Sequence, residues 1–417
     1  MTPAGQLHSV IELVETILSL NKKPADAVMQ SYFRNRRYIG SSDRRTIGDS
    51  VYSVLRNYQG IKAALAISSA RLLVFGHYIL DKEQTIDDIQ ELCGEGYGPS
   101  ELSYEELQIL GELKPYDPFA IPKWLEEHLN DKELIKSLHD QAPMDIRINS
   151  LKNNRDAILT LLKLEGFDVI ATPISPLGIR FGKRQPLNTH ELWEDGTLEV
   201  QDEASQVVSL LCDAQPGMQV LDYCAGAGGK SLSLAATMQN KGNLILSDIH
   251  PHRLQRAKER LRRAGVTSYQ LKDIAKDNSW FKRQHNRFDR VLVDAPCTGT
   301  GTWRRNPDLK NRLTPTDLEE LTQLQQKILE QALQFVKPGG QLIYVTCSVL
   351  DAENDSQVNW LLEKYPEFKS IPVSDVWNKT LKVPCPFTAG TAQFKPSIHG
   401  TDGFFVSIFE RANRACK

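Results

Sequence analysis

Two cysteines in the second half of the chain stand in settings that suit covalent chemistry. Cys297 ends the run Asp294-Ala-Pro-Cys, and Cys347 is the centre of a Thr-Cys-Ser run. A cysteine thiolate is a good nucleophile, although free cysteine also packs as a small buried hydrophobe. Packing is the better explanation for one cysteine alone. Two cysteines that each follow an apolar run favour a chemical role.

A glycine-rich run upstream of both cysteines predicts a binding loop. It reads Asp222-Tyr-Cys-Ala-Gly-Ala-Gly-Gly-Lys-Ser, and its glycines let the backbone turn tightly and approach a ligand. Asp248 stands 26 residues after Asp222, where an acidic side chain can accept both hydroxyls of a ribose. Asp273 is placed to accept from an adenine amino group. Together these residues predict an adenosine site.

The loop alone leaves the type of adenosine compound open. The dinucleotide motif G-x-G-x-x-G does not match. The phosphate-binding motif G-x-x-x-x-G-K-[ST] fits except that Cys224 replaces its first glycine, and Leu292-Val-Asp resembles the magnesium-holding strand of nucleoside triphosphatases. S-adenosylmethionine has no phosphates and needs only close backbone approach, and Asp222 can face its ammonium group.

Strands and helices alternate from about residue 215 onward. These elements must position the loop, the acids and the two cysteines. The strands are predicted from short apolar runs and the helices from helical periodicity. The predicted strands are Val220–Tyr223, Leu244–Ser247, Val291–Val293, Leu342–Val345 and Phe404–Phe409, and the helices include 252–264 and 316–336. Such alternation is typical of a parallel sheet covered on both faces, with ligands outside the carboxyl ends of its strands. We therefore predict an α/β fold with the loop and both cysteines at one sheet edge.

The first half of the chain is predicted to hold two smaller domains. Apolar residues at helical spacing predict an all-helical domain over 1–112. Pro115, Pro118 and Pro122, with Pro143 just beyond, flank a short amphipathic stretch and indicate a linker with helices over 113–142. Alternating apolar residues from Met144 predict a small α+β module over 143–205 with RNA-binding potential. The α/β domain then occupies 206–417.

Composition narrows the class of protein. With 417 residues, 41% hydrophobic and 24% charged, the chain is typical of a globular protein, and it lacks the apolar runs of a membrane span or secretory signal, so we expect it in the cytoplasm. Seven scattered cysteines without a C-x-x-C pair argue against a disulfide framework and a structural zinc site.

The net charge of −2 hides an uneven distribution. Residues 1–80 hold ten lysines and arginines against five acids, residues 81–130 hold three against thirteen, and residues 253–290 hold twelve against four. Basic blocks of this size suit a polyanion such as RNA, although a solvated helix face explains them about as often.

The same motifs, in this order and spacing, resemble the RsmB/Sun family of RNA 5-methylcytosine methyltransferases. The loop, Asp294-Ala-Pro-Cys and Thr-Cys347-Ser carry the likeness, which extends over roughly 143–411 through further matches. These further matches are Arg147-Ile-Asn-Ser-Leu-Lys152, Val200-Gln-Asp-Glu-Ala-Ser205 and Asp402-Gly-Phe-Phe405. The helical domain is weakly similar to NusB through Ser42-Asp-Arg-Arg45 and Tyr52-Ser-Val-Leu-Arg56, but its acidic 81–112 segment is a departure.

The resemblance implies a Rossmann-like methyltransferase domain, preceded by an RRM-like module, that uses S-adenosylmethionine to form 5-methylcytosine in RNA, most simply ribosomal RNA. Cys347 is then the nucleophile, Cys297 acts in product release, and Asp294 binds the cytosine ring nitrogen. The residues expected to bind the cofactor are Asp222, Cys224, Ala225, Gly226, Ala227, Gly228, Gly229, Lys230, Asp248, Arg253, Asp273 and Asp294. Residue patterns alone would not choose between the cysteines, because DNA cytosine methyltransferases place their nucleophile on a Pro-Cys.

RNA contacts are predicted from basic and aromatic residues near these motifs. The candidates are Arg147, Asn149, Lys152, Trp303, Arg304, Arg305 and a basic helix with Arg253, Arg256, Arg260 and Arg263. We expect a monomer without metal. Two alternatives stay open: a P-loop nucleoside triphosphatase acting on RNA, which would leave Cys347 without a role, and an inactive RNA-binding assembly factor, against which the intact cysteines count.

Overall fold

The computed structural model describes residues 1–20, 23–67, 69–94 and 96–413, which form two compact units. The first unit combines Met1–Asp140 with Thr302–Pro315, and the second combines Gln141–Gly301 with the chain from Thr316 onward. The predicted 113–142 linker therefore lies almost wholly inside the first unit. Nothing in the sequence indicated that residues 302–315 leave the α/β domain.

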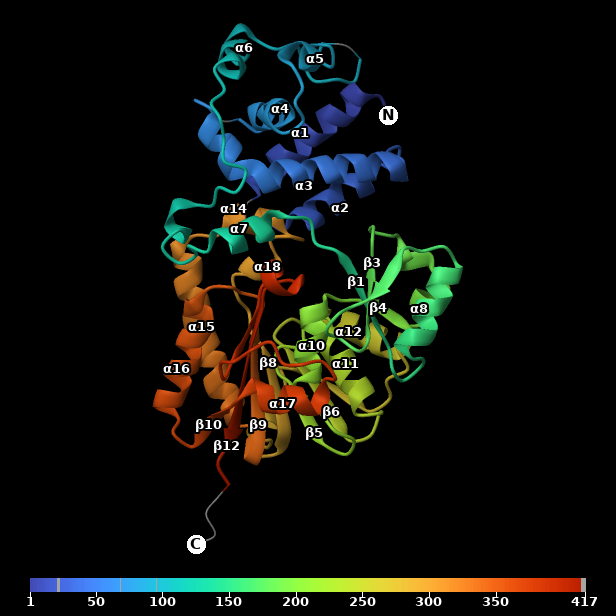
Figure 1. Ribbon diagram of the computed structural model, residues 1–417, viewed down its shortest axis with the longest axis vertical. Coiled ribbons are helices and arrows are strands. Elements are labelled where there is room, and N and C mark those ends of the chain that lie inside the picture. Colours follow the sequence, from blue (N-terminus) through green and yellow to red (C-terminus); the bar gives the residue numbers. More distant parts are fainter. Residues whose placement is uncertain (21–22, 68, 95, 414–417) are drawn as a thin grey trace. The chain divides into compact units, whose positions relative to one another are not determined.

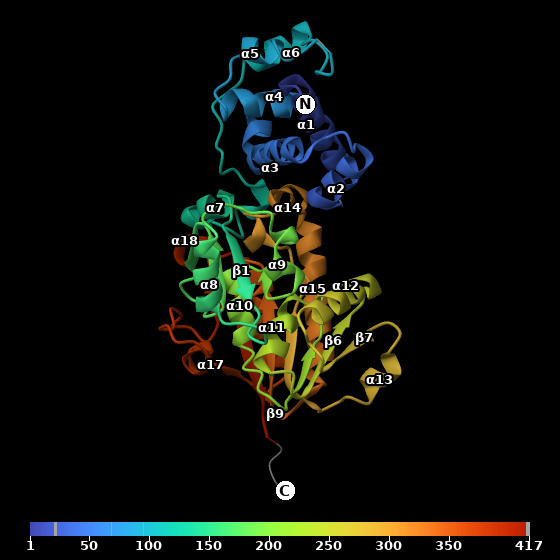
Figure 2. The ribbon, with the colours of Figure 1, turned by 90° about the vertical axis from the view of Figure 1, so that its right-hand side faces the viewer.

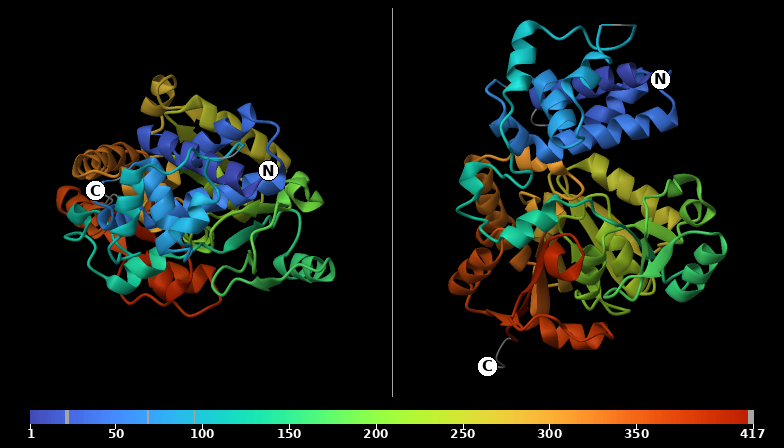
Figure 3. Two further views of the ribbon diagram at one scale, coloured as in Figure 1. Left: turned by 90° about the horizontal axis from the view of Figure 1, so that it is seen from above. Right: turned by 45° about the horizontal axis from the view of Figure 1, so that its top comes forward.

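The first unit is helical, as predicted (Figure 3). Its elements are α1 (Pro3–Ser19), α2 (Ala25–Asn35), α3 (Ser41–Ala64), α4 (Ala70–Leu80), α5 (Ile86–Gln90), α6 (Tyr104–Gly111), η1 (Lys123–Leu125), α7 (Lys132–His139) and α14 (Pro307–Arg312). The helices α1 to α4 pack around a core that includes Leu13, Val51 and Phe75. Its likeness to NusB stays a prediction.

Polar contacts hold α14 within this unit. Asp308 Oδ2 accepts from the Ala25 amide at 3.2 Å, and Asn311 Nδ2 donates to the Leu55 carbonyl at 2.8 Å. The buried Lys310 ammonium donates to the carbonyls of Arg56 and Ala120 at 3.0 and 3.2 Å. These bonds satisfy polar groups that would be costly to bury alone, so the segment is an integral part of the helical unit.

The helical unit is expected to lose stability as the pH falls from about 6.5 towards 4. Burial lowers the pKa of His77 in α4 to about 4, with the Asp81 charge opposing. As the pH falls, this histidine is protonated in the unfolded state at a higher pH than in the folded state. Its contribution to stability is therefore complete above the unfolded pKa of about 6.5 and declines below it. Urea unfolding followed by circular dichroism should show a flatter pH dependence for His77→Leu. The same change at exposed His8 should leave the dependence as it is.

The small module of the second unit is a four-stranded antiparallel sheet in the order β2-β3-β1-β4. Its elements are β1 (Met144–Ile148), α8 (Arg155–Leu164), β2 (Val169–Ala171), β3 (Gly178–Phe181), η2 (Leu187–Thr189), α9 (Glu191–Glu194) and β4 (Leu198–Val200). The chain order β-α-β-β-α-β with this strand order is the ferredoxin-like arrangement, to which RRM-like modules belong. The predicted α+β module is therefore confirmed as a fold.

The α/β domain is built on an eight-stranded sheet (Figures 1 and 2). Seven strands run in the order β10-β12-β9-β8-β5-β6-β7, and β11 pairs with β12. The strands are β5 (Gln219–Asp222), β6 (Asn243–Asp248), β7 (Tyr269–Asp273), β8 (Phe288–Asp294), β9 (Val336–Thr346), β10 (Phe368–Ile371), β11 (Ala392–Phe394) and β12 (Phe404–Arg411). Strands β5 to β9 are parallel, and β10, β11 and β12 are antiparallel additions. This confirms the predicted mostly parallel Rossmann-like sheet.

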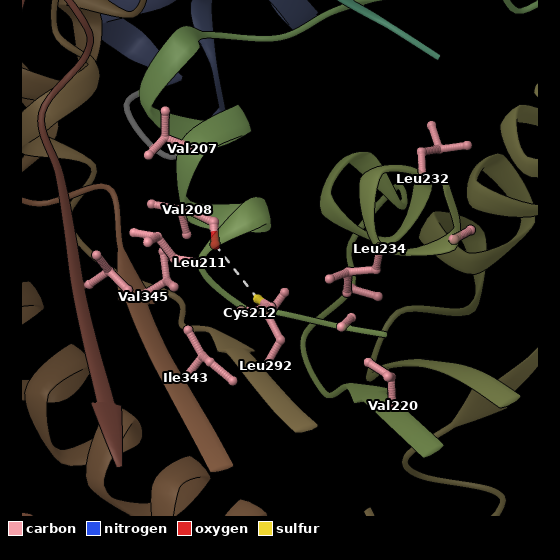
Figure 4. Close-up of a cluster of buried hydrophobic side chains, with 14 of the residues drawn as sticks. Val207, Val208, Leu211, Cys212, Val220, Leu232, Leu234, Leu292, Ile343 and Val345 are labelled. Carbon is pink, nitrogen blue, oxygen red and sulfur yellow. Dashed lines mark hydrogen bonds between the residues drawn. The ribbon is translucent and has the colours of Figure 1, made fainter. Parts of the chain in front are cut away.

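Helices cover both faces of this sheet. The remaining helical elements are α10 (Glu203–Leu210), α11 (Gly229–Thr237), α12 (Pro251–Arg263), α13 (Asn278–Lys282), η3 (Thr300–Thr302), α15 (Pro315–Leu333), η4 (Asp351–Glu353), α16 (Asp355–Lys364), α17 (Val373–Thr380) and α18 (Pro396–His399). One core lies among α10, α11, α12, α17 and the sheet, and the other lies under α13, α15 and α16. Figure 4 shows the first, in which Cys212 Sγ reaches the Val208 carbonyl at 3.6 Å. Within the described residues no helix is long and apolar enough to cross a membrane.

Candidate active site

Polar residues end the five parallel strands at one edge of the sheet. Strands β5, β6, β7 and β8 end at Asp222, Asp248, Asp273 and Asp294, and β9 ends at Thr346, directly before Cys347. The strand registers place Asp248 beside Asp273 and Asp294 beside Val345. The structure thus brings the predicted loop, acids and cysteines to the carboxyl edge, where ligands of such sheets bind.

The glycine loop between β5 and α11 has an open backbone. Gly226 and Gly228 have φ angles of 56° and 79°, which only glycine adopts without strain. No atom lies within 4 Å of where a Cβ on Gly226 would stand. The Gly226 amide donates to Asp248 Oδ2 at 3.0 Å, and the Ala225 amide donates to the Ser247 carbonyl at 2.9 Å. The loop is therefore fixed on β6, and space remains beside it.

Asp222 is placed differently from what we expected. Its side chain is buried, Oδ2 accepts from the Ser231 hydroxyl at 2.5 Å, and Oδ1 has no partner among the described residues. Burial chiefly raises the pKa of Asp222 to about 7. The carboxyl group anchors the start of α11, and contact between Asp222 and a ligand's ammonium group stays a prediction.

The other predicted cofactor acids remain near the loop. Asp248 also accepts from the His250 amide at 2.7 Å, and Arg253, half exposed, approaches Asp248 Oδ2 at 3.9 Å. Asp273 accepts from the Ala275 amide at 3.0 Å and keeps only a small exposed fraction. Each carboxylate retains further acceptor capacity.

Lys230 forms a close ion pair with Asp294. Its Nζ donates to Asp294 Oδ2 at 2.6 Å and lies 5.2 Å from the centre of the Phe404 ring. Burial opposes the ammonium, but the charge and hydrogen bond of Asp294 outweigh it and raise the pKa of Lys230, with Cys347 and Asp222 adding to the effect. The lysine thus stays charged beside one of the two cysteines.

The two sulfur atoms of Cys297 and Cys347 lie 3.3 Å apart. Both side chains are partly accessible, and neither forms a disulfide. The hydrogen bond to Cys347 is the largest influence on Cys297; together with burial and the charges of Cys347 and Glu353 it raises the pKa of Cys297 well above its usual value. The sequence predicted that the two cysteines lie near each other only because each follows a strand of the same parallel sheet.

The other cysteines fit packing roles. Burial raises the pKa of Cys93, Cys212 and Cys224, and a thiol with a raised pKa is a poor nucleophile. Cys385 is partly buried, and Cys416 lies outside the described residues. No cluster of histidine, cysteine and acidic residues in the described chain could hold a metal ion.

Four of the predicted RNA contacts are buried. Arg147 and Asn149 lie in and after β1; the Asn149 amide donates to the carbonyls of Gly196 and Ala264 at 3.0 and 2.9 Å. Trp303 and Arg304 are buried within the helical unit. This burial argues against direct RNA contact, because none of the four presents its polar groups to a polyanion. Arg305, beside them, is partly buried.

Lys152, another of the predicted RNA contacts, is exposed, and its ammonium donates to the Asp195 carbonyl. RNA contact by Lys152 remains a prediction.

Part of the predicted basic helix has a structural role that the sequence did not reveal. Arg260 Nη2 and Arg263 Nη2 both bind the buried Glu199 of β4, and Arg260 Nη1 also donates to the Ala227 carbonyl at 2.7 Å. Arg260 thereby joins the ferredoxin-like module to the glycine loop. Arg256 stays exposed on the same helix.

Comparison with known proteins gives matches over both parts of the second unit. A family model described as 16S rRNA methyltransferase RsmB/F matches residues 209–410, and one described as an RsmF/B-like ferredoxin-like domain matches residues 121–188. A probable ribosomal RNA small subunit methyltransferase B of Bacillus subtilis is 32% identical over 68% of this chain and 65% of its own length. The chain thus spans about two thirds of that relative.

Two further comparisons extend this result. A ribosomal RNA small subunit methyltransferase B of Shewanella oneidensis is 34% identical over 70% of this chain and 68% of that protein. The crystal structure of PH0851 matches with a TM-score of 0.76 and 26% identity, and the match covers 99% of both chains. The structural match therefore includes the helical unit, which the two family models leave largely uncovered.

Proposed function

We propose that this chain, which belongs to the RsmB/F family of 16S rRNA methyltransferases, transfers a methyl group from S-adenosylmethionine to carbon 5 of a cytosine in ribosomal RNA. The observation that carries this proposal is the pair of sulfur atoms 3.3 Å apart, beside Lys230, Asp294 and the glycine loop. Carbon 5 of cytosine is a poor nucleophile, so its methylation needs a covalent activator, which a thiolate supplies.

The residues present fit S-adenosylmethionine better than a nucleoside triphosphate. A phosphate-binding lysine must point to the phosphates, but Lys230 is paired with Asp294, and Ser231 is bound to Asp222 instead of being free for magnesium. The open backbone at Gly226 and the acid Asp248 suit an adenosine without phosphates. When bound, S-adenosylmethionine supplies an electrophilic methyl group on a sulfonium. We place it along residues 224–229, Asp248 and Asp273.

Cys347, Asp294 and Cys297 then share the work on cytosine. The Cys347 thiolate forms a bond to carbon 6, and the ring electrons move towards carbon 5 as Asp294 holds the ring nitrogen that becomes protonated. After methylation, solvent water takes the carbon 5 proton, the electron pair of that carbon–hydrogen bond restores the double bond, and the bond from carbon 6 to sulfur breaks with its electron pair returning to Cys347. Cys297 assists this release. The cytosine must be single-stranded or flipped out to reach these groups.

One experiment tests the reaction directly. The protein is incubated with S-adenosylmethionine and an unmodified small-subunit ribosomal RNA transcript, and the RNA is then mapped by bisulfite sequencing. We expect a cytosine that resists conversion. Methylated RNA without a protected cytosine would contradict the carbon 5 assignment, and no methylation of any ribosomal RNA would contradict the substrate.

Replacing Arg260 by methionine is expected to weaken the binding of S-adenosylhomocysteine about tenfold, because a charge-assisted hydrogen bond to the loop carbonyl of Ala227 is lost. Arg263→Met is the matched control, since Arg263 binds Glu199 but has no hydrogen bond to the loop. Titration calorimetry measures both affinities. Equal losses in the two variants would mean that the Glu199 pairs, and not the bond to Ala227, set the affinity.

A further inference from the structure

A buried carboxylate lies directly behind the Cys297 loop. Glu353, in the short helix η4 that follows Cys347, is fully buried. Its Oε1 accepts from the Thr298 amide and from Gln325 Nε2, both at 2.9 Å, and its Oε2 accepts from the Thr298 hydroxyl at 2.5 Å. All three partners donate, which matches the acceptor-only bonding of an ionised carboxylate and compensates its burial.

The same contacts fix both neighbours of Cys297. Gln325 of α15 donates to the Pro296 carbonyl at 3.0 Å in addition to Glu353, so Pro296 and Thr298 are both held. The Glu353 carbonyl accepts from the hydroxyl of Tyr344 in β9 at 2.7 Å. Since β9 leads into Cys347, Glu353 links the segments that carry the two cysteines.

The charges around the two sulfur atoms are unequal. Cys297 contacts the sulfur of Cys347 and interacts electrostatically with the carboxylate of Glu353 and with the buried Tyr344 phenol. Burial, followed by the charges of Cys297 and Glu353, raises the pKa of Tyr344. Cys347 interacts with the Lys230 ammonium, which Asp294 holds. A negative charge disfavours a thiolate and a positive charge favours it.

We propose that Glu353 is a positioning residue that fixes the Cys297 loop and holds Cys297 as a neutral thiol, so that Cys347 carries the thiolate. This inference rests on the proposed two-cysteine reaction. It adds the reason why Cys347, and not Cys297, is the nucleophile. The neutral Cys297 Sγ–H can donate a hydrogen bond to Cys347 Sγ when the bond to carbon 6 breaks and that sulfur takes back the electron pair. Release is thereby assisted without a net proton transfer between the sulfurs.

The test measures the alkylation of Cys297 in a Cys347→Ser background, which needs neither RNA nor cofactor. The rate with iodoacetamide is followed against pH by peptide mass spectrometry. In Glu353→Gln the shape of the side chain is kept and its charge removed, so we expect the reactive form of Cys297 to appear at least one pH unit lower, about a tenfold faster reaction at a given pH below the midpoint.

Two further variants separate charge from loop position. Gln325→Met keeps the Glu353 charge but removes the clamp on Pro296 and one donor to the carboxylate, so it should lower thermal stability and move the pH profile to higher pH, opposite to Glu353→Gln. Thr298→Val deletes the hydroxyl that donates to Glu353 and leaves its charge less compensated, so the profile should move to higher pH. This variant keeps the proposal testable if Glu353→Gln does not fold.

The outcomes are distinct. An unchanged profile in a folded Glu353→Gln protein, a shift to lower pH in Gln325→Met, or no upward shift in Thr298→Val would overturn the role of Glu353. If the profiles shift as expected but the wild-type protein makes no 5-methylcytosine, the proposed reaction fails and the charge asymmetry of the cysteines stands.

Discussion

Replacing Cys297 with alanine is expected to leave the protein covalently joined to RNA, whereas Cys347→Ala should form no adduct at all. In the proposed reaction the Cys347 sulfur makes the bond to carbon 6, so its loss removes the first covalent step and methylation with it. The Cys297 sulfur, 3.3 Å away, is proposed to act when that bond breaks. Without it, the adduct should persist after methyl transfer, and turnover should stop after one cycle.

Denaturing electrophoresis after incubation with labelled RNA and S-adenosylmethionine detects the adduct as a shifted band. Cys385→Ala is a suitable control, because Cys385 is also partly buried but bonds only to the Phe387 carbonyl, at 3.6 Å. We expect wild-type turnover and no stable adduct from it. A stable adduct with Cys347→Ala and none with Cys297→Ala would reverse the two roles.

Lys230→Met is expected to lower kcat by about 10²–10³-fold, the usual loss when one buried group that stabilises a developing charge is removed. The variant removes the positive charge next to Cys347 and leaves Asp294 without its partner at 2.6 Å. The sequence placed Lys230 among the cofactor ligands, and the ion pair moves it towards the cytosine side of the site. We therefore expect the rate of adduct formation to fall while the affinity for S-adenosylhomocysteine changes little.

Single-turnover adduct formation and titration calorimetry distinguish the two roles of Lys230. Lys364→Met, which breaks a surface ion pair with Glu330, controls for the loss of one lysine. A large loss of S-adenosylhomocysteine affinity, with normal adduct formation at saturating cofactor, would return Lys230 to the cofactor site.

The sequence predicted the elements whose pattern is local and missed the contacts that depend on tertiary packing. Strands such as 220–223 and 342–345 were found because buried parallel strands are continuous apolar runs. Strand β7 was missed because Tyr269–Asp273 has only partly buried positions and mixed polarity. The meeting of Cys297 and Cys347 could be predicted because both follow strands of one parallel sheet.

Side-chain roles were harder to predict, because a charged residue looks the same in a sequence whether it is solvated or buried. Arg147 was a plausible RNA ligand until its burial near Glu199 was known. Glu353 and Gln325 carried no motif, and the one available signal was an acid six residues after Cys347. Its partners come from two other segments, which only the fold brings together.

The path of the chain also constrains how this protein can have been assembled in evolution. The chain completes its first helical unit by Asp140, builds most of the second unit, and then returns 14 residues, Thr302–Pro315, to the first. A gene fusion or exchange at a single breakpoint therefore cannot deliver either unit whole. One that replaced residues 1–140 would leave the side chains of Trp303 and Lys310 without the surroundings that bury them. An exchange that keeps the helical unit intact would have to carry residues 302–315 together with residues 1–140.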